Sequence, residues 1–302
     1  MFKRCLIAAD GSEPSRQAAL SFAKLGLADE GQVEVVGVLE LDGVTRHGLF
    51  SLNEDERARI LDNYRVESLE GVHKALEEAG LYVSQLHVKE GSAADAICEL
   101  AEERQSELLV VGRRGLGRIA DVLLGSVSRK VVEHAPCPVL VVPPELDETT
   151  ATGHIVAPTD FSAAASGGVR LAAKIARSVG ARLDLVHTVP PFRLVPLGYD
   201  DAGLIDEGAL IEAHKGMVES ARARLKDEAE SLRKEFDLTV EAHFADADPA
   251  DGVIEVARRV GARAIVLSSH GYTGLKKLWL GSVAESILRH AHCPVLIARV
   301  AT

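Results

Sequence analysis

The stretch GSVSRKVVEHAPCPVL, residues 125–140, recurs in the same chain as GSVAESILRHAHCPVL, residues 281–296. Nine of these 16 positions are identical at a constant offset of 156 residues. A second match aligns AADGS, residues 8–12, with PTDFS, residues 158–162, at an offset of 150. Self-similarity over such long periods indicates one structural unit used twice, so we expect the 302-residue chain to consist of two homologous halves.

Each half contains short apolar or alternating runs of strand length, separated by stretches of helical periodicity. The runs predict strands at residues 5–9, 33–38, 82–88, 108–111 and 138–142, and again at 155–159, 183–189, 240–244, 264–267 and 294–298. Helices between apolar strands imply crossover connections and therefore a parallel sheet covered on both faces. We expect two tandem α/β domains, each a doubly wound five-stranded parallel sheet, at residues 1–143 and 154–302, joined by a linker at 144–153.

The composition is that of a globular protein, with 47% hydrophobic and 26% charged residues. A formal net charge of −11 argues against a nucleic-acid partner, because phosphate backbones are bound chiefly by Lys and Arg. No apolar run approaches the roughly 18 residues of a membrane span, and no signal-peptide pattern opens the chain. The four cysteines form neither a CxxC pair nor a zinc-ligand spacing. We expect a cytoplasmic protein with reduced thiols and no membrane partner.

One glycine-rich segment, residues 112–126, joins a predicted strand to a predicted helix. Glycine has no Cβ and lets a backbone approach a phosphate closely. Gly125 and Ser126 open the helix, whose N–H groups and positive dipole end suit an anion, and we expect Ser126 to be the N-cap. The pattern is also typical of a simple tight turn, and it contains neither GxxxxGK(S/T) nor GxGxxG.

The spacing of Gly112, Gly115, Gly125 and Ser126 resembles the ATP-binding signature of the universal stress protein family. The segment HAPCPVLVV, residues 134–142, is similar to the last strand of that family, and Asp10 matches its acidic residue at the nucleoside. The resemblance covers nearly the whole chain, once in each half. It implies a Rossmann-like fold with strand order 3-2-1-4-5, in which Asp10 and the turn at Gly112 share one crevice.

The resemblance implies an adenine nucleotide as ligand, either ATP or AMP or ADP, with Mg²⁺ bridging the phosphates as a further family property. It assigns the nucleoside to two first-half residues, Asp10 and Val38, and the phosphates to Gly112, Arg113, Gly115, Gly125, Ser126 and Val127. The corresponding second-half residues are Asp160, Thr188, Ser268, Gly271, Gly281, Ser282 and Val283.

The second half departs from this pattern at Ser268, which takes the place of the first glycine. A left-handed backbone at that position would cost Ser on the order of 1 kcal/mol. Thr188 replaces Val38, and His270 stands where the first half has Arg114. We therefore expect nucleotide binding mainly in the first half.

The leading interpretation is a stress-response regulatory protein that binds an adenine nucleotide. A slow ATPase and a partner-binding scaffold that has lost its ligand stay open as alternatives. The sequence shows no evident general base or Walker-B acid, so we assign no catalytic residue and no metal ligand and expect at most weak hydrolysis. Two recurring pairs have structural interpretations: His134 and His290 as packed or helix-terminal residues, Cys137 and Cys293 as core residues.

The last predicted strand of each half, residues 139–142 and 295–298, is apolar. An isolated apolar edge strand is an aggregation liability, so it should be covered. Single-domain members of the family that the chain resembles pair through this strand. We expect the halves to pair in the same way as an intramolecular pseudo-dimer, with a homodimer left open.

Overall fold

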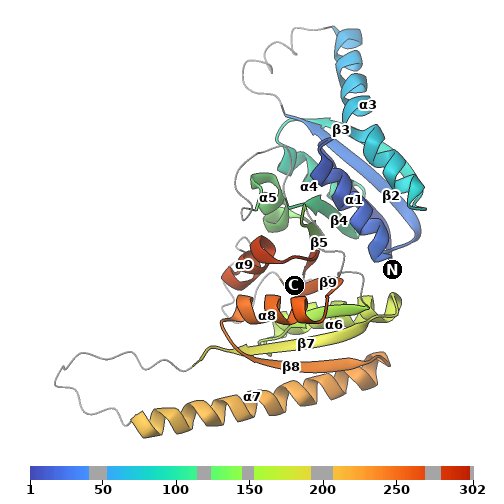
Figure 1. The fold of residues 1–302 in the computed structure, drawn as a ribbon. Coiled ribbons are helices and arrows are strands. Elements are labelled where there is room, and N and C mark those ends of the chain that lie inside the picture. Colours follow the sequence, from blue (N-terminus) through green and yellow to red (C-terminus); the bar gives the residue numbers. More distant parts are fainter. Residues whose placement is uncertain (41–52, 114–123, 145–152, 192–206, 269–279, 300–302) are drawn as a thin grey trace, which may run out of the picture.

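The computed structural model describes residues 1–40, 53–113, 124–144, 153–191, 207–268 and 280–299 (Figure 1). The first half contains β1 (Phe2–Ala8), α1 (Glu13–Leu25), β2 (Ala28–Leu39), α3 (Glu54–Glu78), β3 (Val83–Glu90), α4 (Ala93–Glu103), β4 (Leu108–Gly112), α5 (Ser126–His134) and β5 (Val139–Val142). The second half contains β6 (His154–Pro158), α6 (Ala163–Ser178), β7 (Arg182–Val189), α7 (Glu207–Phe236), β8 (Val240–Asp246), α8 (Pro249–Arg259), β9 (Ala264–Ser268), α9 (Ser282–His290) and β10 (Val295–Ala298). Every predicted strand is confirmed, although β1 and β2 begin several residues earlier than predicted.

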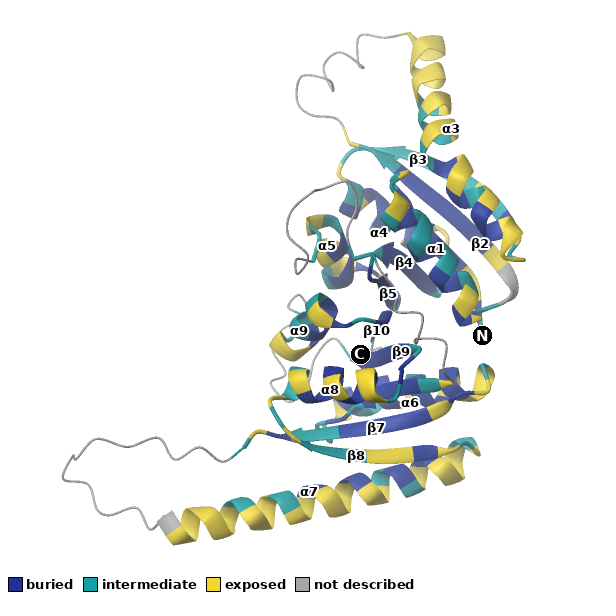
Figure 2. Cartoon of the chain, in the orientation of Figure 1, coloured by how far each residue is buried: buried dark blue, intermediate teal, exposed yellow. Residues whose placement is uncertain are grey.

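The strands that the structure describes form one ten-stranded sheet in the order β3-β2-β1-β4-β5-β10-β9-β6-β7-β8. Neighbouring strands within each half are parallel, and each half has the expected order 3-2-1-4-5. β5 and β10 pair antiparallel, with Leu140 opposite Leu296. Both strands are buried along their whole length (Figure 2), so the predicted pseudo-dimer is confirmed and each half covers the apolar edge of the other.

Helices cover both faces of this continuous sheet (Figure 1). One face carries α1, α3, α6 and α7, whose apolar residues, such as Phe22 and Leu225, share a core with the sheet. The other face carries α4, α5, α8 and α9, with Val131 and Ile287 in a second core. The fold is therefore a three-layer sandwich in which helices α5 and α9 lie on the same side of the sheet.

Local sequence signals explain where the helices begin. Ser12 caps α1 by accepting from the N–H of Ser15, and Asn53 forms a capping box with Glu56 at the start of α3. The outward faces of α3 and α7 are largely exposed (Figure 2). Among the helices that the structure describes, none is both long enough and apolar enough to cross a membrane. Most of the predicted linker, residues 145–152, lies outside the described residues.

Candidate functional site

The carboxyl ends of β1 and β4 lie side by side in the first half. Ile7 of β1 stands opposite Val110 of β4. Asp10, two residues after β1, and Gly112, the last residue of β4, therefore lie at the same edge of the sheet, the one formed by the carboxyl ends of the strands. Val38 is the next-to-last residue of β2, the strand on the other side of β1. The helices that follow β1 and β4 belong to opposite faces of the sheet. This edge is the topological switch point, where open α/β sheets usually bind ligands.

Asp10 is held by the turn that starts α1. Its Oδ1 accepts hydrogen bonds from the N–H of Ser12 at 3.0 Å and from the Ser12 hydroxyl at 2.5 Å. Gly11 has a φ of +77°, and a Cβ there would lie 2.9 Å from the Cα of Ser68 on α3. Only glycine fits this turn without strain, and the turn fixes the carboxylate at the end of β1.

The two ends of the glycine-rich segment lie against each other. The N–H of Gly125 donates to the carbonyl oxygen of Arg113 at 2.9 Å. The buried hydroxyl of Ser128, in the first turn of α5, donates to the carbonyl oxygen of Gly112 at 2.7 Å. Strand end and helix start are therefore tied together across the segment. Gly115 lies outside the described residues.

The expectation that Ser126 caps α5 was wrong. Ser126 is the first helical residue, and Gly125 is the N-cap, with φ −59° and ψ 148°. No side chain of the described residues makes a capping hydrogen bond to this helix start. Its first-turn N–H groups and positive dipole end suit an anion, while the Ser126 side chain is exposed and Val127 is half-buried.

The side chain of Arg113, an expected phosphate contact, makes a hydrogen bond to the second half. The Arg113 Nη1 donates to the carbonyl oxygen of Ala291, at the carboxyl end of α9, at 2.8 Å. The backbone N–H of Arg113 donates to Val142 of β5. The guanidinium therefore reaches across to the second half, where it satisfies a helix carboxyl end. This bond joins the two halves, and the contact of Arg113 with phosphate stays a prediction.

Tyr64 of α3 is a residue of this edge that the sequence did not single out. Its hydroxyl donates to the carbonyl oxygen of Val38 at 3.0 Å. Burial raises the pKa of Tyr64, and the carboxylates of Asp10 and Glu40 raise it further. The phenol therefore stays protonated beside Asp10 and Val38. Its position on the buried side of an amphipathic helix was the only sequence signal.

The second half repeats the acidic turn but fills the space next to it. Asp160 Oδ1 accepts from the N–H of Ser162 at 3.0 Å, as Asp10 does from Ser12. Phe161 takes the place of Gly11 and keeps the left-handed backbone, with φ +61°. Its ring lies 4.3 Å from the ring of His187, which stands at the position of Gly37. Two glycine positions of the first half thus carry rings in the second.

The junction of β9 with α9 in the second half is also altered. Ser268 ends β9 in extended conformation, paired with Ala298, so the proposed cost of a left-handed backbone does not apply. Gly281 is the N-cap of α9, and Ser282 and Val283, the first helical residues, are exposed. Ala284 replaces Ser128, so the hydroxyl that ties helix to strand is missing.

Thr188, which corresponds to Val38 in the first half, packs against α8. A Cβ added to Gly252 of that helix would lie 2.7 Å from the Thr188 methyl carbon, so the two elements are in close contact. Two other positions, Gly271 and His270, lie outside the described residues. Thr188 thus stands at the register position of Val38 with its methyl group committed to packing.

The structural interpretations of the recurring His and Cys residues are confirmed. His134 and His290 are the last residues of α5 and α9, and each Nδ1 bonds to a carbonyl oxygen one turn earlier, of Lys130 or Ser286. Cys137 and Cys293 are buried and unpaired in disulfides. They precede β5 and β10 by two residues rather than opening those strands.

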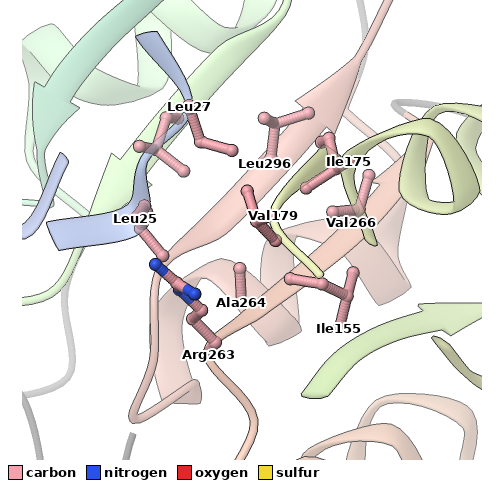
Figure 3. Close-up of a pocket in the computed structure, with 10 residues that line it drawn as sticks. Leu25, Leu27, Ile155, Ile175, Val179, Arg263, Ala264, Val266 and Leu296 are labelled. Carbon is pink, nitrogen blue, oxygen red and sulfur yellow. The ribbon is translucent and has the colours of Figure 1, made fainter. Parts of the chain in front are cut away.

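A small cavity of about 10 Å³ lies between the halves (Figure 3). Apolar side chains line it, among them Leu25, Leu140, Ile155 and Leu296, and Arg263 stands at its edge. The volume corresponds to roughly one water molecule, and none of the predicted site residues contributes to the lining. This cavity is a packing defect of the joint and does not fit a nucleotide.

Both halves of the chain are similar to proteins of one family. The model of the Universal stress protein family matches residues 1–143 and 152–299. A universal stress protein of Methanocaldococcus jannaschii is 34% identical over 145 residues, which is 47% of this chain and 82% of the relative. The crystal structure of a universal stress protein from Archaeoglobus fulgidus aligns over 98% of this chain and 95% of its own, with a TM-score of 0.67 and 21% identity. A universal stress protein solved in complex with cAMP is 26% identical, over 47% of this chain and 97% of its own, with a TM-score of 0.37.

Proposed function

The chain belongs to the universal stress protein family, and on that premise we propose that it binds an adenine nucleotide, ATP or its relatives AMP and ADP, mainly through its first half. One observation carries the proposal. The end of β4 and the start of α5 are tied together by Ser128, and the helix start has a glycine as its N-cap. Backbone N–H groups and a positive dipole end are then available to a phosphate at the switch point of the sheet.

The neighbouring residues suit the nucleoside. Asp10 holds its carboxylate at the end of β1, where it can accept hydrogen bonds from ribose hydroxyls. Val38 offers an apolar side chain, half-buried beside this edge, to the base. The phosphates would then lie along Gly112, Gly125 and the first turn of α5, with Gly115 in the segment between.

A Mg²⁺ ion, when bound with the nucleotide, would neutralise phosphate charge. Mg²⁺ takes oxygen ligands and keeps several waters, and the exposed hydroxyl of Ser126 at the helix start is a suitable protein donor. The protein residues themselves bind and orient the nucleotide. Backbone amides and a serine hydroxyl hold phosphate but are too weakly basic to activate water. We therefore propose a protein that retains its nucleotide and turns it over far more slowly than the roughly 10 s⁻¹ of a typical enzyme.

The second half is proposed to bind more weakly. Phe161 and His187 take up space where the first half has two glycines, and Ala284 cannot tie α9 to the end of β9. Ser268 adds a side chain at the strand end, where Gly112 has none. Each change removes room or order from the edge at which the nucleotide would lie.

The test begins with untagged protein, which is denatured and examined by mass spectrometry for a released nucleotide. Nucleotide-free protein is then titrated by calorimetry with ATP and Mg²⁺ and, in parallel, with cAMP, the ligand of one solved relative. Gly125→Val should abolish the main binding event, because the side chain would cover the helix start. The backbone angles of Gly125 are open to valine, so circular dichroism should show an intact fold.

Gly281→Val is the matched control, since it makes the same change at the N-cap of α9. It should leave the main binding event unchanged. Undiminished ATP affinity in Gly125→Val would rule out the first-half site. If Gly281→Val lost ATP binding and Gly125→Val did not, the nucleotide would bind in the second half, and the proposal would be wrong.

A further inference from the structure

Four polar side chains gather on β6, β7 and β8, away from the nucleotide edge: His154, Asp184, Glu241 and His243. Asp184 is fully buried. Its Oδ1 bonds to Nε2 of His243 at 2.7 Å, and its Oδ2 bonds to Nδ1 of His154 at 2.8 Å. The ligand atoms of Asp184, Glu241 and His243 all lie within 4.8 Å of one another.

The strand register produces this cluster. Asp184 of β7 stands directly opposite Glu241 of β8 in the parallel pairing, and His243 follows two residues later. Side chains at i and i+2 of a strand share a face, so Glu241 and His243 both lie on the side of the sheet that Asp184 faces. Regular backbone, rather than a loop, therefore positions the three donors.

The first half has the same framework with different chemistry. Glu34 stands at the register position of Asp184, and its Oε2 bonds to Nε2 of His87 at 2.7 Å. There, however, Arg104 also bonds to both Glu34 oxygens, and Gln85 takes the place of Glu241. A guanidinium thus offsets the buried carboxylate, and the neighbouring side chain carries no charge.

The second half reverses both features. Asp184 makes its hydrogen bonds with two imidazoles, where Glu34 has a guanidinium, and Glu241 adds a second carboxylate at the opposite register position. Two carboxylates and one imidazole nitrogen therefore lie close enough together to bind the same ion. One nitrogen and two carboxylate oxygens suit Zn²⁺ and related ions, whereas Mg²⁺ and Ca²⁺ favour oxygen alone.

We propose that Asp184, Glu241 and His243 form a binding site for a divalent transition-metal ion of the zinc class, independent of nucleotide binding. His154 holds the far oxygen of Asp184 and orients the carboxylate, as outer hydrogen bonds commonly do for metal ligands. Zn–N and Zn–O distances are about 2.0–2.2 Å, so donor atoms that already lie within 4.8 Å of one another need only small movements to bind one ion. The ion replaces the proton between Asp184 and His243, and the exposed side chain of Glu241 turns in to complete the site.

One neighbouring cation competes with the ion. Nη2 of Arg259 lies 3.3 Å from Nδ1 of His243, so the ring accepts a hydrogen bond there and carries its proton on Nε2. Metal binding moves that proton to Nδ1, and Arg259, whose side chain is exposed, turns toward solvent. The bound ion would then cross-link the edge strand β8 to β7.

Zinc itself is the probe. Untagged, chelator-treated and nucleotide-free protein is titrated with Zn²⁺ against a chromophoric chelator, and with Co²⁺ for its visible absorption. Wild type should bind one tight equivalent, and Zn²⁺ should raise the thermal midpoint. Glu241→Gln introduces the residue that the first half has at the same register position, Gln85, and the site is exposed. It should lower the affinity for Zn²⁺ at least about tenfold and change the Co²⁺ spectrum. His154→Asn should lower the affinity for Zn²⁺ about tenfold.

Gln85→Glu is the matched control in the first half. It places a carboxylate at the register position of Glu241, but Arg104 remains on Glu34, so a second zinc equivalent should not appear. Absence of tight zinc in wild type would overturn the proposal, as would equal zinc affinity in wild type and Glu241→Gln. Gly125→Val should bind zinc like wild type, so that failure of the nucleotide proposal and failure of the metal proposal remain separate results.

Discussion

Ser128→Ala tests whether the junction of β4 and α5 acts as a preformed binding element. The substitution removes the buried hydroxyl that donates to Gly112 at 2.7 Å. A net hydrogen bond contributes about 0.5–1.5 kcal/mol, and a carbonyl left without a partner costs about 1–3 kcal/mol when water cannot reach it. Gly112 is half-buried, so water replaces part of the lost bond, and we expect the free energy of unfolding to fall by about 1–2 kcal/mol.

The same substitution should weaken nucleotide binding, because the helix start is no longer held against the strand end. If about 1 kcal/mol of the loss falls on the bound state, the ATP dissociation constant rises about fivefold. Urea titrations followed by circular dichroism give the stability, and calorimetry gives the affinity. Ala284→Ser, the reverse change in the second half, should leave first-half affinity unchanged. If Ser128→Ala lost stability but bound ATP as wild type does, the bond would be structural and the reasoning refuted.

Three further predictions address other contacts. Arg113→Met should lower stability by about 1–2 kcal/mol yet keep ATP affinity within about twofold, because its guanidinium bonds to α9; calorimetry showing lost ATP binding would contradict this. Burial opposes ionisation of Glu34, but hydrogen bonds from Arg104 and an imidazole outweigh burial and lower its pKa. The stabilisation by ionised Glu34 is complete above its ordinary pKa of 4.5 and disappears as pH falls through the lower pKa of the folded protein. In urea titrations, the stability advantage of wild type over Glu34→Gln should therefore shrink below pH 4.5. An advantage that does not change with pH would count against this explanation. Burial raises the pKa of Cys137 and Cys293 to about 12, so both thiols should resist iodoacetamide at neutral pH until denaturant is added, as mass spectrometry can show.

The sequence predicted the strands well because each is a short apolar or alternating run between amphipathic helices. The pairing of β5 with β10 was predictable for a related reason, since an apolar edge such as Val139–Val142 has to be covered. The strand order came from the family resemblance, because hydrophobic periodicity does not report which strands are neighbours.

Two features of the glycine-rich segment could not be predicted from the sequence, and they share a physical cause. Arg113 is adjacent to Gly112 in sequence, but its side chain bonds to Ala291, 178 residues away, and that contact depends on how the halves pack. The N-cap of α5 is Gly125 rather than Ser126 because the backbone of Gly125 is extended, with ψ 148°, whereas Ser126 is already helical. Long side chains and helix ends are settled by tertiary contacts, which one-dimensional patterns do not contain.

The two halves have diverged at the carboxyl-end edge of the sheet more than in the segment that joins them. CPVL occurs in both halves, at 137–140 and 293–296, and its Val and Leu belong to the buried, paired strands β5 and β10. At the edge, by contrast, Phe161 keeps a left-handed backbone that costs a residue with Cβ roughly 1 kcal/mol, and its ring packs against His187. A strained position is retained when the surrounding structure fixes it, and here the packing fills space at the edge where the proposed nucleotide would lie. The second half thus serves the first by covering β5 and by accepting the Arg113 hydrogen bond, and its own edge is free to acquire other chemistry.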